Sequence, residues 1–161
     1  MPFSPATVAN YFLERASASG QPLTPMQVIK LTYIAHGWHL GYFNAPLIGE
    51  RVEAWRYGPV IDSLYHSLKR YGNSAVQAFL PAPIDEDARL RVTGNTANLL
   101  DHVWQRYGRL SGPQLSTLTH QPNTPWSQVW NAAGPFARSE PISDELIQQH
   151  YQQMISGEVA A

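Results

Sequence analysis

Apolar residues recur with a helical period along much of the chain. In the longest such stretch they follow one another at steps of three and four residues: Val28, Leu31, Ile34, Ala35 and Trp38. Steps of this kind place side chains on one face of an α-helix. The pattern predicts a largely buried helix that begins at Pro25 and closes at Gly41. Similar periods predict helices over residues 5–18, 61–71, 97–107, 113–119 and 125–132, and a last one from near Ser143 to just before Gly157.

Proline marks the expected helix starts. It is tolerated at the first helical position, and a small or hydroxyl residue before it can cap the free backbone N–H groups. This pairing occurs five times, at Ser4-Pro5, Thr24-Pro25, Gly58-Pro59, Gly112-Pro113 and Thr124-Pro125. We therefore interpret many of the 13 prolines as helix punctuation in an ordered chain. At the third pair, Tyr57 to Val60 are expected to turn the chain sharply into the helix that follows.

The period changes to two between residues 47 and 55. Charged and apolar residues alternate there, as in a short, half-buried strand: Arg51, Val52, Glu53 and Ala54. A strand needs a partner, and residues 40–43 and 88–93 are the two candidates. Either choice predicts a small antiparallel sheet.

The rest of the pattern completes the expected fold class. Residues 73–95 read as a loop with a short helix and a strand, because prolines and three successive acidic residues break any long period. The chain is predicted to be an α+β protein, mainly α-helical, with about six to eight helices and a small antiparallel β-sheet. We expect a single domain over residues 1–161, with a core at about 3–156 and a short flexible C-terminal tail.

Composition excludes some classes of function. The chain has 161 residues, no cysteine and a formal net charge of −1, so thiol chemistry is excluded and no overall field attracts nucleic acid. No stretch approaches the roughly 18 apolar residues that would span a bilayer. We expect a soluble, cytoplasmic protein with no membrane partner, no specific nucleic-acid partner and no cofactor.

Two classes of function have some support in the sequence: a small metal-dependent enzyme and a nucleic-acid-associated regulator. His36 and His39 lie three residues apart on one predicted helix, which suits a shared metal. A small metal-dependent enzyme using such histidines is therefore one alternative, although no third ligand is evident and no metal site is predicted. A nucleic-acid-associated regulator is the other, since several cations could line up with exposed aromatic rings: Arg51, Arg56, Lys69, Arg70, Arg89 and Arg91.

The chain is rich in aromatic residues, which anchor cores first and interfaces second. If a few of them remained exposed together, a protein-binding patch would be favoured. The candidates are Tyr42, Phe43, Trp55, Tyr57, Trp126 and Trp130.

Three motifs in order carry a family resemblance. They are the segment 23–35, which contains Lys30-Leu31-Thr32-Tyr33, the segment 53–60, which reads Glu-Ala-Trp-Arg-Tyr-Gly-Pro-Val, and Leu115 to His120 followed by Pro125-Trp126. Together with Ala9 to Leu13, they resemble the Panacea domain, also called the SocA-like antitoxin domain. The resemblance runs from about Phe3 to Trp130. It departs at Thr32, where a larger apolar residue is expected.

The resemblance implies an antitoxin of a bacterial or phage toxin–antitoxin pair, which neutralises a cognate toxin by direct binding without catalysis. It also allows a second mechanism, in which the protein acts as an adaptor that delivers the toxin to a protease. The motif residues, structural or toxin-binding, are Lys30, Tyr33, Glu53, Trp55, Tyr57, Gly58, Pro59, Val60, Tyr65, His120, Pro125 and Trp126.

Burial adds one expectation about the motif. A buried lysine needs a polar partner. We therefore expect Lys30 and Tyr33 to be hydrogen-bonded in the interior with Glu53 or His120.

Overall fold

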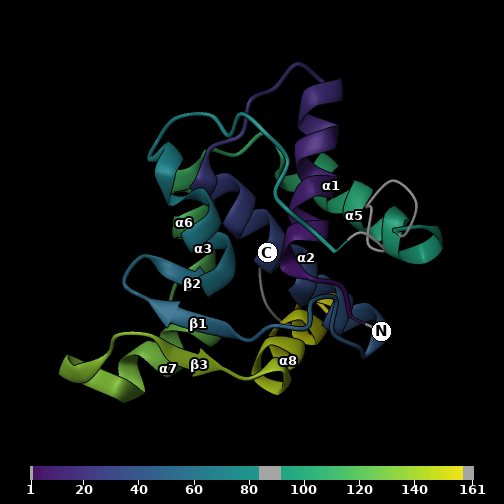
Figure 1. Cartoon of the computed structure of the whole chain (residues 1–161). Coiled ribbons are helices and arrows are strands. Elements are labelled where there is room, and N and C mark those ends of the chain that lie inside the picture. The colour runs from purple at the N-terminus through teal and green to yellow at the C-terminus, as the bar shows by residue number, and fades with distance from the viewer. Residues whose placement is uncertain (1, 84–91, 158–161) are drawn as a thin grey trace.

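Helix α2 (Pro25–Phe43) runs through the middle of the fold, and four other helices make most of the helix contacts around it (Figure 1). The computed structural model describes residues 2–83 and 92–157. Burial is unbroken from Val28 to Leu40, so all sides of α2 are covered and not one face alone. The helices around it are α1 (Pro5–Ala18), α5 (Gly94–Tyr107), α6 (Gly112–Thr119) and α8 (Asp144–Ile155).

The described residues contain seven α-helices, which confirms the mainly helical α+β class. The two remaining α-helices are α3 (Asp62–Leu68) and α7 (Pro125–Ala133), and the short 3-10 helices are η1 (Lys69–Tyr71) and η3 (Gly134–Phe136). Among the described residues, none of the helices has both the length and the apolar character needed to cross a bilayer.

Four of the five proline-marked helix starts are confirmed. The side chains of Ser4, Thr24, Ser111 and Thr124 each accept a hydrogen bond from a backbone N–H of the first turn that follows, although the cap of α6 is Ser111 and not Gly112. The fifth start is wrong, because Gly58 and Pro59 belong to a strand and the helix begins only at Asp62.

The end of α2 also differs from expectation. Gly41 does not close the helix, which continues to Phe43. Asn44 then caps it in the left-handed conformation, with φ 55°, and its N–H donates to the carbonyl of Leu40. Asparagine tolerates this conformation better than most residues, so it can serve where glycine usually stands.

The sheet has three antiparallel strands in the order β2-β1-β3: β1 (Val52–Trp55), β2 (Gly58–Val60) and β3 (Glu140–Ile142). Both β2 and β3 pair with β1, so that Glu53 faces Val60 on one side and Pro141 on the other. Residues 40–43 were the wrong partner, since they lie in α2. The other candidate, 88–93, lies largely outside the described residues, as do the predicted C-terminal tail and residues 84–91 of the 73–95 segment.

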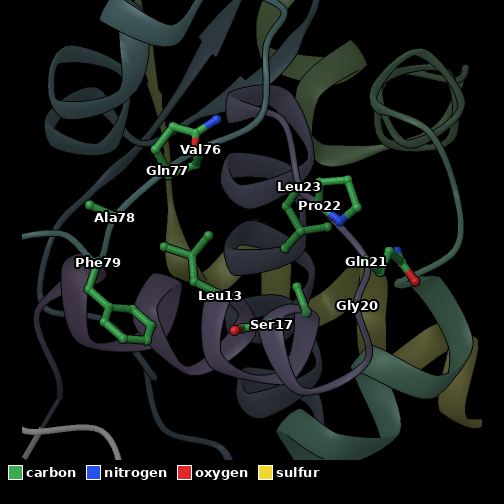
Figure 2. Close-up of a pocket in the computed structure, with 11 residues that line it drawn as sticks. Leu13, Ser17, Gly20, Gln21, Pro22, Leu23, Val76, Gln77, Ala78 and Phe79 are labelled. Atoms are coloured by element: carbon green, nitrogen blue, oxygen red, sulfur yellow. The ribbon is translucent and has the colours of Figure 1, made fainter.

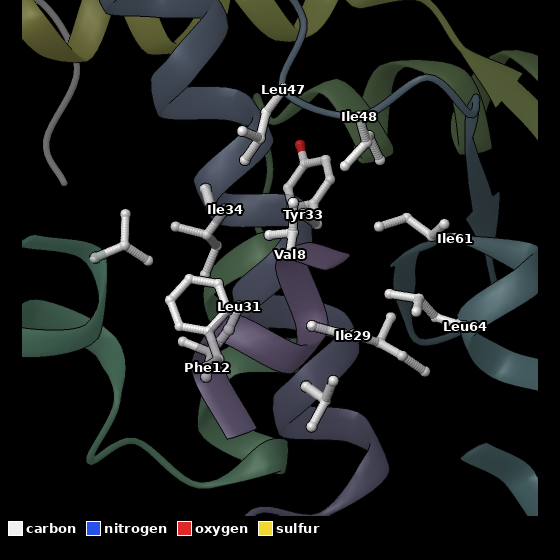
Figure 3. Close-up of a cluster of buried hydrophobic side chains, with 14 of the residues drawn as sticks. Val8, Phe12, Ile29, Leu31, Tyr33, Ile34, Leu47, Ile48, Ile61 and Leu64 are labelled. Carbon is white, nitrogen blue, oxygen red and sulfur yellow. The ribbon is translucent and has the colours of Figure 1, made fainter. Parts of the chain in front are cut away.

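The apolar core fills the space between α1, α2 and the segment that follows α2 (Figure 3). Phe12 of α1 lies beside Leu31 of α2, and Leu47 and Ile48 close the other end of the cluster. These side chains are almost fully buried, which removes a large apolar surface from water and fixes α2 as the axis of the fold. Strand β2 of the β1–β2 hairpin contacts α2, and Lys30 of α2 hydrogen-bonds to Pro59 there.

Candidate functional site

The β1–β2 hairpin turns through Arg56 and Tyr57 and closes on Gly58. Gly58 has φ +117°, a conformation that L side chains rarely adopt. A Cβ at Gly58 would also stand 3.0 Å from Nζ of Lys30 and 3.4 Å from Oγ1 of Thr119. The glycine thus allows the turn and leaves room for the lysine amine.

Lys30 enters this site from α2 and is 2% exposed. Its Nζ donates to the carbonyl oxygen of Pro59, 2.8 Å away. The expected partners, Glu53 and His120, are wrong for this amine. Burial lowers the pKa of Lys30 to about 7, because a charged ammonium loses hydration in the interior.

Glu53 pairs with Arg51 and not with Lys30. Its Oε2 accepts a hydrogen bond from Arg51 Nε at 2.9 Å, and Oε1 accepts one from Trp55 Nε1 at 3.0 Å. A buried carboxylate is stabilised by such donors. Glu53 therefore fixes the indole of Trp55 on the hairpin instead of neutralising Lys30.

Helices α6 and α7 brace the outer part of the hairpin. Trp126 Nε1 donates to the carbonyl of Trp55 at 2.5 Å, and Ser116 Oγ donates to the carbonyl of Tyr57 at 2.5 Å. His120 hydrogen-bonds to the Ser116 carbonyl one turn back, and its ring meets that of Trp126 edge-on. With Pro125 at the first position of α7, these motif residues hold the backbone of the turn.

A pocket of about 470 Å³ opens between the hairpin, the first turns of α2 and the end of α3. The rings of Trp55 and Tyr65 pack edge-on at 4.8 Å along it, and Tyr57 stands at the rim with 62% of its surface exposed. The lining residues are Pro25, Met26, Ile29, Lys30, Trp55, Arg56, Tyr57, Val60, Tyr65, Lys69, Gly72 and Asn73.

The structure brings only part of the motif to this pocket. Lys30, Trp55, Tyr57, Val60 and Tyr65 line it, whereas the other motif residues support it from behind or lie elsewhere. Tyr33 is the clearest example of a motif residue that lies away from the pocket. It is buried against the ring of Tyr151 in α8, and this burial raises its pKa.

Apart from Lys30, sequence reasoning missed the α2 side of the pocket. Pro25, Met26, Ile29 and Lys30 fall at helical steps of three and four, which could have grouped them on one face. No sequence pattern identifies Asn73, which lies in the turn after η1.

The two histidines considered for a metal have other partners. His36 Nε2 lies 2.9 Å from Asp144 Oδ1, and its Nδ1 accepts from the N–H groups of Leu47 and Ile48. His39 Nδ1 hydrogen-bonds to the carbonyl of Ala45. Within residues 2–83 and 92–157, no group of three or more His, Asp or Glu residues is arranged to hold a metal ion.

The proposed cationic surface and the proposed aromatic patch are both divided. Arg51 is paired with Glu53, and Arg89 and Arg91 lie outside the described residues. Tyr42 and Phe43 are exposed at the C-terminal end of α2, while Trp126 is buried beneath the hairpin. Tyr57 and Tyr65 are exposed at the pocket, beside the partly exposed Trp55.

A second pocket, of about 410 Å³, lies between the end of α1, residues 20–23 and residues 76–79 (Figure 2). Leu13 lies between Leu23 and residues 78–79 in this view, and Phe79 lies at one side. Among the described residues no charged side chain lines it, and its polar side chains are those of Ser17, Gln21 and Gln77.

Residues 28–127 match the protein family described as "Antitoxin SocA-like, Panacea domain". The chain belongs to this family. A curated relative, Antitoxin SocA of Caulobacter vibrioides (strain NA1000 / CB15N), is 28% identical over 140 residues, which cover 79% of this chain and 70% of the relative. No solved structure matches the chain. Membership of the Panacea family supports an antitoxin role.

The matched range contains the whole β1–β2 hairpin together with α3, α6 and most of α2. Strand β3 and helix α8 follow it in the chain and lie outside the match. The Panacea match thus includes every pocket-lining residue except Pro25 and Met26.

Proposed function

We propose that this Panacea protein is an antitoxin that neutralises a cognate toxin in the cytoplasm by direct protein–protein binding, without catalysis. The toxin is bound at the hairpin pocket. The observation that carries this proposal is that aromatic side chains of the family motif, Trp55, Tyr57 and Tyr65, line one pocket together with three cationic residues, with Tyr57 62% exposed at its rim.

The construction of the hairpin suits binding. Interface anchors are commonly Trp, Tyr and Arg, and they contribute most when they are held rigidly before the partner arrives. Glu53 holds the indole of Trp55, and the carbonyls of Trp55 and Tyr57 are held by Trp126 and Ser116. The indole of Trp55 and the backbone of the turn therefore lose little conformational freedom when a partner covers them.

Co-expression tests the proposal. The chain is produced together with the product of the neighbouring gene, and growth and co-purification are scored in the same cells. Rescue of growth with a stable complex supports direct neutralisation. A neighbour that is toxic and not rescued, or that is harmless alone, counts against it.

Two exposed tyrosines make a matched pair for mapping the toxin-binding surface: Tyr57 on the hairpin and Tyr42 near the C-terminal end of α2. Tyr57→Ala removes the exposed ring at the pocket, and we expect at least about tenfold weaker toxin binding. Tyr42→Ala removes a ring that is 54% exposed at the far end of α2 and serves as the control. Equal losses in both variants, or no loss in either, contradict the placement of the binding surface.

Delivery of the toxin to a protease is a second mechanism that the family resemblance allows. The same cells separate the two mechanisms when the toxin is followed by immunoblot. Under direct neutralisation the toxin accumulates in the complex, whereas under delivery its level falls when the antitoxin is present and recovers when the protease is removed.

A further inference from the structure

The amine of Lys30 is incompletely satisfied within its own chain. An ammonium carries three N–H donors, and burying it costs free energy unless acceptors replace water. In the part of the chain that the structure describes, the one acceptor for Nζ is the Pro59 carbonyl. None of the ion pairs found there includes Lys30.

Other buried polar groups nearby are treated differently. Glu53 is 6% exposed and receives donors on both carboxylate oxygens. Thr119 donates to the carbonyl of Leu115. Lys30 therefore differs from its neighbours in keeping hydrogen-bonding capacity, and it does so in the wall of an open pocket.

The pocket as a whole is positively charged. Lys30, Arg56 and Lys69 line it, and no carboxylate of the described residues does, although the full chain carries a net charge of −1. The guanidinium of Arg56 lies over the ring of Tyr57 at 5.4 Å, which places one cation at the rim beside an aromatic anchor. Apolar side chains of Met26, Ile29 and Val60 complete the wall.

We propose that this pocket receives the side chain of an aspartate or glutamate on the toxin. Its carboxylate accepts a hydrogen bond from Nζ of Lys30, and apolar neighbours in the same toxin segment pack against Met26, Ile29 and Trp55. The inference rests on the proposed function and names the chemistry of the partner at that site.

An acidic side chain fits this site better than a nucleic-acid backbone. A phosphate backbone follows a line of exposed cations. Here the three cations line one hollow together with apolar side chains, and Lys30 among them is buried. Such a hollow accepts one anion on a short stem, and the exposed Arg56 and Lys69 attract it from solution.

The pKa of Lys30 is consistent with this assignment. Burial lowers it to about 7, so the free protein carries a partly neutral amine near neutral pH. A carboxylate brought against Nζ favours the charged form and raises this pKa. Toxin binding is therefore expected to take up protons above pH 7, and affinity should fall between pH 7 and pH 9.

Lys30→Met tests the proposal. Methionine is an unbranched apolar side chain that cannot donate a hydrogen bond, and it removes a buried charge instead of creating one. We expect binding of the toxin to weaken at least about tenfold. Lys69→Gln should weaken binding less and reduce its salt dependence, and Arg109→Gln, an exposed cation outside the pocket, is the control.

A double-mutant cycle identifies the carboxylate. Each acidic residue of the toxin is replaced by its amide, and each variant is measured against wild-type antitoxin and against Lys30→Met. One toxin substitution should weaken binding to the wild type and have little further effect with Lys30→Met.

The outcomes separate the two proposals. If the wild-type chain fails to rescue growth, the antitoxin proposal fails and this inference fails with it. If rescue succeeds and Lys30→Met binds as tightly as the wild type, the inference alone is overturned. Weakened binding without coupling to any toxin side chain, or competition by duplex DNA in place of that coupling, also overturns it.

Discussion

Two buried polar side chains stand six residues apart on α2 and are treated in opposite ways. His36 has no exposed surface, and both of its ring nitrogens are hydrogen-bonded. Since Nδ1 accepts from two backbone N–H groups, Nε2 carries the proton and donates to Asp144. Lys30 is equally buried, but it has a single carbonyl acceptor and an open pocket beside it.

This contrast distinguishes a residue that stabilises the fold, His36, from one proposed to bind a partner, Lys30, on the same helix. His36 hydrogen-bonds to Asp144 of α8 and to the segment at Leu47 and Ile48, so both of its ring nitrogens have partners within the fold. Lys30 has unused N–H donors within the described residues, and it also lines a pocket that another molecule can enter. A buried polar residue thus indicates a site when its hydrogen bonds are incomplete, and burial alone does not.

Replacement of His36 tests the structural half of the comparison most severely. His36→Leu leaves the N–H groups of Leu47 and Ile48 without their acceptor in the interior. We expect the free energy of unfolding to fall by about 3 to 5 kcal/mol. Urea denaturation measures the loss.

Asp144→Asn is the control for this change, because it keeps an oxygen near Nε2. It should cost no more than about 1 kcal/mol, through the loss of a negative charge in the first turn of α8. A His36→Leu variant as stable as the wild type would show that the histidine is not the support we describe.

Replacement of Lys30 should have the opposite sign. Lys30→Met removes the desolvated ammonium and costs only the hydrogen bond to Pro59. At pH 6 we expect the free energy of unfolding to rise, on the order of 2 kcal/mol. Thermal and urea unfolding measure it, and a marked loss of stability would mean that the lysine supports the fold as His36 does.

The pH dependence of that difference sharpens the result. The pKa of Lys30 is about 7 in the folded protein and near 10.5 when unfolded. Between these values the unfolded chain binds more protons, so wild-type stability rises with pH. The advantage of Lys30→Met should therefore shrink as pH increases from 7 to 10, followed by urea titrations of both proteins. A difference that stays constant over this range contradicts a buried, titrating amine.

Gly58 gives a smaller and more local test. Gly58→Ala combines a strained φ with a Cβ 3.0 Å from Lys30 Nζ, whereas Gly20→Ala has a positive φ with open space around it. Gly20→Ala should cost about 1 kcal/mol, and Gly58→Ala about 2 to 3 kcal/mol. The midpoint of urea unfolding compares them, and equal costs would place the lysine amine elsewhere.

The helical part of the fold could be predicted because its signals are local. Capping residues, prolines and apolar periods all act within a few residues, so α1, α6 and α7 were found nearly to their ends. Strand β3 was missed because it has three residues and pairs with a strand more than 80 positions earlier. Gly58-Pro59 was misread as a helix start because the same dipeptide also suits the start of an edge strand.

The candidate site could be predicted only in part. The motif named Lys30, Trp55 and Tyr57, yet it also named Tyr33, which is packed in the core against α8. Which motif side chains are supports and which face a pocket depends on how α2 is rotated against the hairpin. That rotation is set by packing against four other helices.

The sequence by itself determined the mainly helical class, the positions of most helix starts and the family, because these follow from residue types at short spacing. Only the tertiary structure decided the partners of the buried polar groups. It assigned Glu53 to Arg51 and Trp55, His36 to Asp144, and Lys30 to a carbonyl at the wall of a pocket. The physical reason is that hydrogen bonds are satisfied between segments distant in the chain, and the core that brings those segments together also determines which donor is left for another molecule.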